Sequence, residues 1–116
     1  MTSFKNIAKS ILLTAMLVSV ASTSALADVK KGQKLYLKTL KSKLNMNGTK
    51  FSSLHTVSEW EALFANKGEG FITEFSHDYP KSDKVLHKKN IWKKLQHIRD
   101  FAIEYGSDSG NVPSCG

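Results

Sequence analysis

Apolar residues recur at steps of three and four along two long stretches of the chain, which is the spacing of an amphipathic α-helix. In the first stretch, Tyr36, Leu40 and Leu44 follow one another at steps of four, while lysines occupy positions between them. The turn-forming residues 45–48, Asn-Met-Asn-Gly, then interrupt the pattern. The sequence therefore predicts a first helix over residues 28–44.

The second stretch begins at Ser82, whose hydroxyl suits a helix N-cap, and ends at Gly106. Asn90 is a candidate for a break within this helix. The apolar residues step by four, three, four and three: Ile91, Leu95, Ile98, Ala102 and Tyr105. Because both stretches carry an apolar stripe that needs a partner, we expect the first and last helices to pack against each other.

Shorter helices are predicted between these two. Thr56 and Glu59 have the spacing of a capping box, in which each side chain accepts a hydrogen bond from the other residue's backbone N–H. The helix that follows carries Trp60 on its apolar face and stops at Gly68. We expect another short helix over 71–76, because a single strand would have nothing to pair with.

The predicted fold class is therefore all-α: a small single domain of three to five helices. We expect this helical domain to cover residues 28–105. A C-terminal tail over 106–116 follows it, since glycine, serine and proline there prevent the last helix from continuing.

The first 27 residues are typical of a secretory signal peptide. Lys5 and Lys9 precede an apolar stretch over 11–21, and small residues follow up to Ala27. The apolar stretch is shorter than the ~20 residues that span a bilayer, so we expect cleavage between Ala27 and Asp28 rather than a membrane anchor. The mature chain would then lie in the periplasm and have no transmembrane segment.

The chain is basic, with a formal net charge of +7. Loss of residues 1–27 removes two of the 17 basic residues and none of the ten acidic ones, which leaves the mature chain at +5. Such a charge would suit a nucleic-acid partner in the cytoplasm, but the expected export argues against that partner. The lysines of the first helix form a solvated face or a surface that docks an acidic partner or an anionic membrane, and the candidate residues are Lys34, Lys38 and Lys41.

The chemistry of the side chains argues against an enzyme. The sequence has no G-x-S-x-G, no glycine-rich phosphate loop and no H-E-x-x-H. His87 and His97 are about 15 Å apart if the predicted last helix is continuous, which is too far for them to share a metal ion. We therefore expect no catalytic residue.

The candidate metal ligands are His55, Met46 and Cys115. Met46 and Cys115 carry the only sulfur atoms after residue 27, and soft ions such as Cu(I) prefer thiolate, thioether and imidazole ligands. A copper site would have to be assembled from these residues in space, since no methionine-rich motif is present. A single cysteine forms no internal disulfide, and the redox state of Cys115 and the oligomeric state stay open.

Two stretches of the chain resemble a known family. Residues 30–60, KKGQKLYLKTLKSKLNMNGTKFSSLHTVSEW, and residues 101–115, FAIEYGSDSGNVPSC, are similar to small exported bacterial proteins described as cytochrome-c-like. Some of those proteins are associated with copper-resistance efflux systems. The matching pattern joins a lysine-rich G-x-x-x-Y helix, a T-x-x-E-W cap and a D-S-G-N-V-P-S-C tail.

The resemblance implies a helix arrangement related to cytochrome c, a role in copper tolerance and a partner in the periplasm or in an efflux system. Relatives of this family carry cysteines near the positions of Leu44 and Tyr79, which this chain lacks. Covalent haem is excluded because Leu40, Lys43 and Leu44 stand where a C-x-x-C-H motif would place its two thiols and its histidine.

The function expected is therefore that of a non-enzymatic periplasmic binding or accessory protein in the tolerance of copper or another metal. Two alternatives stay open. One is an electron-transfer protein that holds haem non-covalently through a histidine, and the other is an adaptor that docks an acidic partner through its lysine-rich first helix. We also expect the tail to fold back, with Val112 on an apolar surface and Cys115 near the domain.

Overall fold

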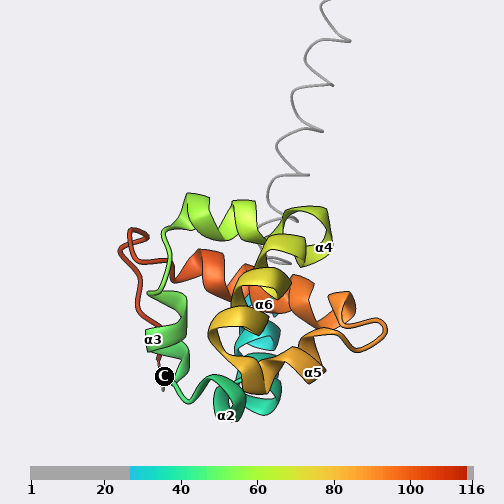
Figure 1. Cartoon of the computed structure of the whole chain (residues 1–116). Coiled ribbons are helices and arrows are strands. Elements are labelled where there is room, and N and C mark those ends of the chain that lie inside the picture. The colour runs from blue at the N-terminus through green and yellow to red at the C-terminus, as the bar shows by residue number, and fades with distance from the viewer. Residues whose placement is uncertain (1–26, 115–116) are drawn as a thin grey trace, which may run out of the picture.

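The computed structural model describes residues 27–114, and in that range the chain is helical with no strand, which confirms the all-α fold class (Figure 1). Residues 27–39 form what we call the N-terminal helix. It is followed by α2 (Lys41–Leu44), α3 (Gly48–Ser52), α4 (Val57–Asp78), the 3-10 turn η1 (Pro80–Ser82), α5 (Asp83–Leu86) and α6 (Trp92–Glu104). Residues 1–26 of the predicted signal peptide lie outside the described residues.

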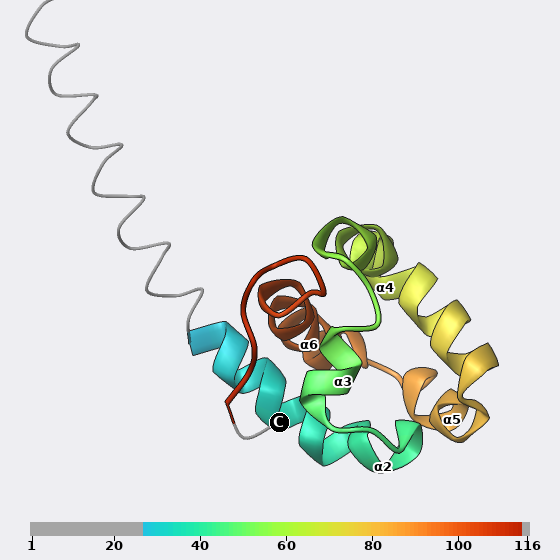
Figure 2. The ribbon, with the colours of Figure 1, turned by 90° about the vertical axis from the view of Figure 1, so that its left-hand side faces the viewer.

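The N-terminal helix crosses α6 at Gly32. A Cβ atom on Gly32 would lie 1.9 Å from the carbonyl oxygen of His97, so the two helices approach as closely as their backbones allow. One turn further along, the ring of Tyr36 stacks on that of Phe101, with centroids 6.2 Å apart. Figure 2 shows the two helices side by side. The expected packing of the first helix against the last is confirmed.

The core is a cluster of aromatic rings that joins the N-terminal helix, α3, α4 and α6. Phe51 of α3 lies at its centre and stacks on Tyr36 at 4.2 Å between centroids. The same ring contacts Trp60 at 5.1 Å, and the edge of Phe75 at 5.9 Å. Phe51, Tyr36 and Trp60 are fully buried. Apolar packing of this kind stabilises a small domain whose single cysteine can form no internal disulfide.

The polar ends of two core rings are hydrogen-bonded to the backbone. The hydroxyl of Tyr36 donates to the carbonyl of Met46 at 2.7 Å, and Nε1 of Trp60 donates to the carbonyl of Ser52 at 2.9 Å. Burial raises the pKa of Tyr36, because the charged phenolate would lose its hydration. These bonds hold both ends of α3 against the core.

Each of the two long predicted helices is divided. The first is interrupted at Leu40 and ends at Asn45, which has the left-handed φ of 55°. The second is interrupted between Leu86 and Trp92, and Asn90 in that gap has a φ of 64°, as its turn-forming character predicts. His87 and His97 therefore do not share one helix.

The predicted cap at Ser82 is wrong. Its hydroxyl makes no capping bond to α5. Instead it donates to the carbonyls of Phe75 and Tyr79 at 3.0 and 2.7 Å. Ser82 is buried at the end of α4, and both carbonyls also accept a backbone N–H, that of Tyr79 at Phe75 and that of Ser82 at Tyr79.

α4 consists of two helical halves joined at a kink. Its start is the predicted capping box: the Thr56 hydroxyl accepts from the N–H of Glu59, and the Glu59 carboxylate accepts from the N–H of Thr56. Residues 65–68 leave the helical conformation, and Gly68 has a φ of +78°. The first half therefore ends where the sequence predicts, and the expected helix over 71–76 belongs to the second half.

The described part of the tail folds back, as expected. The N–H of Ser107 donates to the carbonyl of His55, and the carboxylate of Asp108 accepts from the N–H of Val57 at 2.8 Å. The carbonyl of Ser114 accepts from Nε2 of Gln33 on the N-terminal helix. Figure 2 shows this path in dark red.

Two further details of the tail concern its apolar residues and its thiol. The side chain of Val112 is 74% exposed, so its predicted burial is wrong, and Pro113 is the buried residue instead. Burying a proline ring costs no side-chain conformational entropy, which favours Pro113 over Val112 at the buried position. The predicted position of Cys115 lies outside the described residues.

Gly32→Ala should destabilise the protein. Alanine favours a helix over glycine by up to ~1 kcal/mol, but its methyl group would collide with the backbone of α6. We expect a net loss of about 1–3 kcal/mol or more in the free energy of unfolding, measured by urea denaturation. Lys31→Ala, at the exposed neighbouring position, should change it by less than about 0.5 kcal/mol. A stability gain for Gly32→Ala would contradict the crossing.

Trp60→Ala should cost ~3–5 kcal/mol of unfolding free energy, because it empties the centre of the core. Trp92→Ala is the matched control, since the indole of Trp92 is only partly buried and lies under the guanidinium of Arg99. Trp92→Ala should lower the free energy of unfolding by less than Trp60→Ala does in the same denaturation experiment. A cost under about 1 kcal/mol for Trp60→Ala would mean that this ring is not part of the core.

Asp108→Ala should lower the melting temperature, because it removes an acceptor and a negative charge from the N-terminus of α4. The expected loss is about 0.5–2 kcal/mol. Asp108→Asn keeps the acceptor oxygen and should lose less. Val112→Ala, at an exposed site of the same tail, is expected to melt like the unchanged protein. If Asp108→Ala also left the melting temperature unchanged, the tail would not stabilise α4.

Candidate metal centre

The structure places His55 between two carboxylates. Its Nε2 lies 2.6 Å from Oε2 of Glu74, and its Nδ1 lies 3.5 Å from Oε1 of Glu59. The edge of the ring also packs on Trp60, with centroids 4.9 Å apart. The N–H of Thr56 hydrogen-bonds to Glu59 and lowers the pKa of its carboxyl group, because the bond favours the charged form. Both ring nitrogens of His55 thus face partners within the protein.

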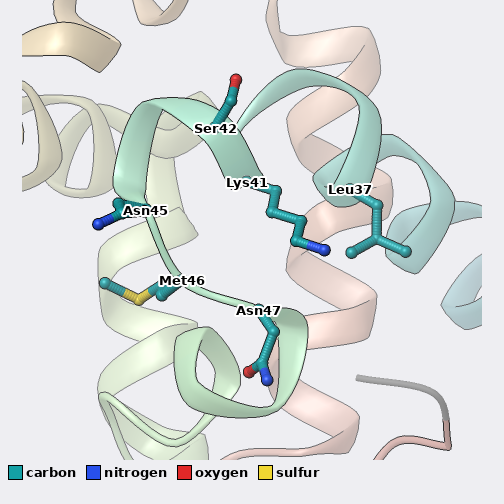
Figure 3. A pocket seen from close by; sticks show the side chains of 6 residues that line it. All are labelled: Leu37, Lys41, Ser42, Asn45, Met46 and Asn47. Atoms are coloured by element: carbon teal, nitrogen blue, oxygen red, sulfur yellow. The ribbon is translucent and has the colours of Figure 1, made fainter.

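Met46 lies in a different place from His55. It lines a shallow pocket of about 370 Å³ between the N-terminal helix, α2 and the start of α3 (Figure 3). The other lining residues are Leu37, Lys41, Ser42, Asn45 and Asn47, none of which carries a carboxylate, an imidazole or a thiol. His55 lines a separate pocket of about 250 Å³ together with Glu59 and Glu74. A shared site of Met46, His55 and Cys115 stays a prediction, and Cys115 lies outside the described residues.

The three candidate lysines are accessible. Lys34 and Lys38 on the N-terminal helix and Lys41 on α2 are all exposed. Within residues 27–114, none of them forms an ion pair. Their charges are therefore available to a partner from outside.

A set of metal-ligating side chains lies where the N-terminal helix meets α6. One ligand atom each of Asp28, His97 and Asp100 lies within 4.8 Å of the other two. His97 and Asp100 are three residues apart on α6 and therefore share one face of that helix. Asp28 comes one turn before Gly32 and is brought to them by the helix crossing. We call these three residues the Asp–His–Asp set.

The distance between Asp28 and His97 does not fit a direct hydrogen bond. Nδ1 of His97 is 3.6 Å from Oδ1 of Asp28, beyond the usual 2.7–3.2 Å range. This nitrogen exposes less than 1 Å² and has no hydrogen-bond partner among the described residues. Two ligands on a tetrahedral ion with bonds of about 2.0–2.1 Å lie about 3.3–3.4 Å apart. The observed distance is therefore close to that between two ligands of one metal ion.

Asp100 retains capacity for a ligand although it is paired with its neighbour. Nη2 and Nε of Arg99 lie 3.1 and 3.2 Å from one carboxylate oxygen, Oδ1. Among residues 27–114, no hydrogen bond or ion pair engages the other carboxylate oxygen. The side chain of Asp100 is 27% exposed and that of Asp28 is 45% exposed, which leaves a path for an ion from solvent. The negative charge of Asp28 offsets the repulsion that Arg99 would exert on a cation.

The donor types of the Asp–His–Asp set define the chemistry it supports. Imidazole and carboxylate ligands suit divalent first-row ions such as Zn(II) and Cu(II), and not Cu(I), which prefers sulfur. The set is not recognisable from the sequence alone, because Asp28 and His97 are 69 residues apart along the chain. The available signal was the His-x-x-Asp spacing of His97 and Asp100 on an expected helix.

The surroundings of His55 argue against non-covalent haem at this partly buried histidine, and the haem alternative stays a prediction. The pocket beside His55 is lined by the carboxylates of Glu59 and Glu74, and apolar rings fill the space on the other side of the imidazole. Those rings are Trp60 and Phe75, which are both buried. A porphyrin would need an apolar slot against the histidine, and the rings occupy that position.

Comparison with protein-family models, with curated proteins and with solved structures gives no match for this chain. Within residues 27–114, no helix combines the length and the apolar character needed to cross a bilayer.

Proposed function

We propose that this chain is an exported, non-enzymatic protein that binds a divalent first-row transition-metal ion and serves the tolerance or handling of copper or a similar metal. The observation that carries this proposal is the Asp–His–Asp set, in which a buried imidazole nitrogen without a hydrogen-bond partner lies 3.6 Å from a carboxylate oxygen. Cu(II) binds more tightly than other ions of this series to a given nitrogen and oxygen site, so copper is the favoured ligand.

The position of the set supports the proposal. Two helices hold its members, and their backbones are in close contact at Gly32. Preorganisation of this kind lowers the conformational entropy lost on binding. The apparent signal peptide and the resemblance to exported copper-tolerance proteins agree with such a role.

A second candidate function is that of an adaptor. It is favoured by the exposure of Lys34, Lys38 and Lys41 and by the lack of an acidic partner for them within residues 27–114. A metal-binding accessory protein that delivers its ion to an acidic partner would combine the two functions. Mutation of these three lysines to glutamine would then weaken the complex and leave metal affinity unchanged.

The metal site is tested by titrating the mature chain with Cu(II) and Zn(II) in a calorimeter, in a Cys115→Ser background that avoids thiol oxidation. We expect binding of one ion. His97→Ala and Asp100→Asn should each weaken it by at least about tenfold, because even changes around a ligand have effects of 10–100-fold. Saturation at 100 times the dissociation constant should stabilise the fold by about 2.7 kcal/mol.

His77→Ala is the matched control for this titration, since the side chain of His77 is 88% exposed and its ring lies beside Asp78. Its affinity should equal that of the parent chain. Circular dichroism confirms that each variant is folded. If His97→Ala bound as tightly as His77→Ala, the Asp–His–Asp set would not be the site, and His55→Ala with Met46→Leu would then test the alternative.

A further inference from the structure

The Asp–His–Asp set supplies three protein ligands, whereas a closed tetrahedral site has four. One member, Asp28, is also the residue at which the mature chain is expected to begin. Its backbone nitrogen is attached to the same Cα as the side chain whose carboxylate belongs to the set. The question is whether that nitrogen becomes a ligand.

We propose that cleavage after Ala27 completes the metal centre by releasing the α-amine of Asp28 as its fourth ligand. This inference rests on the proposed function. In the uncut chain the nitrogen of Asp28 belongs to a peptide bond, whose lone pair is delocalised into the carbonyl. Hydrolysis of that bond leaves a primary amine, which has a lone pair to donate. The amine and the β-carboxylate of one aspartate close a six-membered chelate ring on a metal ion.

After cleavage, Asp28 would be the first residue of the N-terminal helix, and this location suits the role. The first N–H groups of an α-helix have no acceptor within the helix, so the amine gives up no backbone hydrogen bond when it binds an ion. Side chains tilt toward the N-terminal end of a helix, which turns the carboxylate of Asp28 to the same end as its amine. His97 and Asp100 then complete a set of two nitrogen and two oxygen ligands.

Local charge opposes the ion and must be offset. The N-terminal end of a helix carries a partial positive charge, and Arg99 lies against Asp100. The two carboxylates of the set oppose both effects. In a chain without the free amine, the ion would meet the same repulsion and have one ligand fewer. The affinity of that chain for metal should therefore be markedly lower.

The consequence is a site that binds metal only after export. The precursor, still joined to residues 1–27, has three ligands and low affinity, whereas the processed chain has four. Such an arrangement keeps the precursor from taking up metal ions before it crosses the membrane. The event that activates the site is peptide-bond hydrolysis, and it needs no further reactant besides water.

The test compares two chains in the Cys115→Ser background. One begins at Asp28, and the other carries a short glycine–serine extension before Ala27. Calorimetry with Zn(II) and Cu(II) is run at pH 8.5, above the ordinary α-amine pKa of about 7.7–8.0. We expect at least about tenfold tighter binding by the chain that begins at Asp28. Electron paramagnetic resonance of bound Cu(II) should show two nitrogen ligands in that chain and one in the extended chain.

His97→Ala in both chains separates the possible results. If His97→Ala removes the difference in metal affinity between the two chains, the amine and the imidazole bind the same ion, which supports the inference. A difference that persists would mean that the amine binds metal by itself, which overturns the inference.

Two other results are decisive in different ways. The two chains could bind metal with equal affinity, and His97→Ala could abolish binding in both. That result overturns the inference that cleavage completes the metal centre, but it leaves the proposed function standing. Absence of binding in both chains overturns the proposed function. Mass spectrometry of the exported protein must also give a chain that starts at Asp28, and any other start overturns the inference.

Discussion

The close approach of two helix backbones at Gly32 positions the other features of the fold. Asp28, Gly32 and Tyr36 are spaced four residues apart and therefore lie along one face of the N-terminal helix. That face supplies in turn a candidate metal ligand, the contact with the carbonyl of His97 and a ring of the aromatic core. A side chain at the middle position would separate the helices and displace both neighbours together. The candidate site and the core therefore depend on one steric constraint.

The aromatic core and the tail also stabilise the fold. The single cysteine of the chain can form no internal disulfide. Phe51 joins rings from the N-terminal helix and α4, so α3 is held although it is too short to be stable alone. The tail adds a link between distant segments, because Asp108 bonds to the N–H of Val57 and Ser114 bonds to Gln33. These contacts tie the tail to the start of α4 and to the middle of the N-terminal helix.

The sequence predicted those features that depend on local pattern. The stripe through Tyr36 and the capping box at Thr56 were recognisable because their energetics involve residues within one or two turns. The interruption at Leu40 was not, since no residue there demands it. The Asp–His–Asp set was hidden for a different reason: its members meet only through the crossing at Gly32, and the geometry of a helix crossing is decided by packing across the whole interface.

In residues 27–114, His55 and His97 each lie beside two carboxylates, and geometry distinguishes the two clusters. At His55, the ring nitrogen and Glu74 are 2.6 Å apart, which is a short, direct hydrogen bond that satisfies both groups. Inserting an ion there would break a bond already made. At His97 the separation is 3.6 Å, and the buried Nδ1 lacks a hydrogen-bond partner in the described structure. Because an unsatisfied buried nitrogen costs about 1–3 kcal/mol, a bound ion would remove a penalty at His97 and create one at His55. The same residue types therefore suit a structural role at His55 and the proposed metal binding at His97.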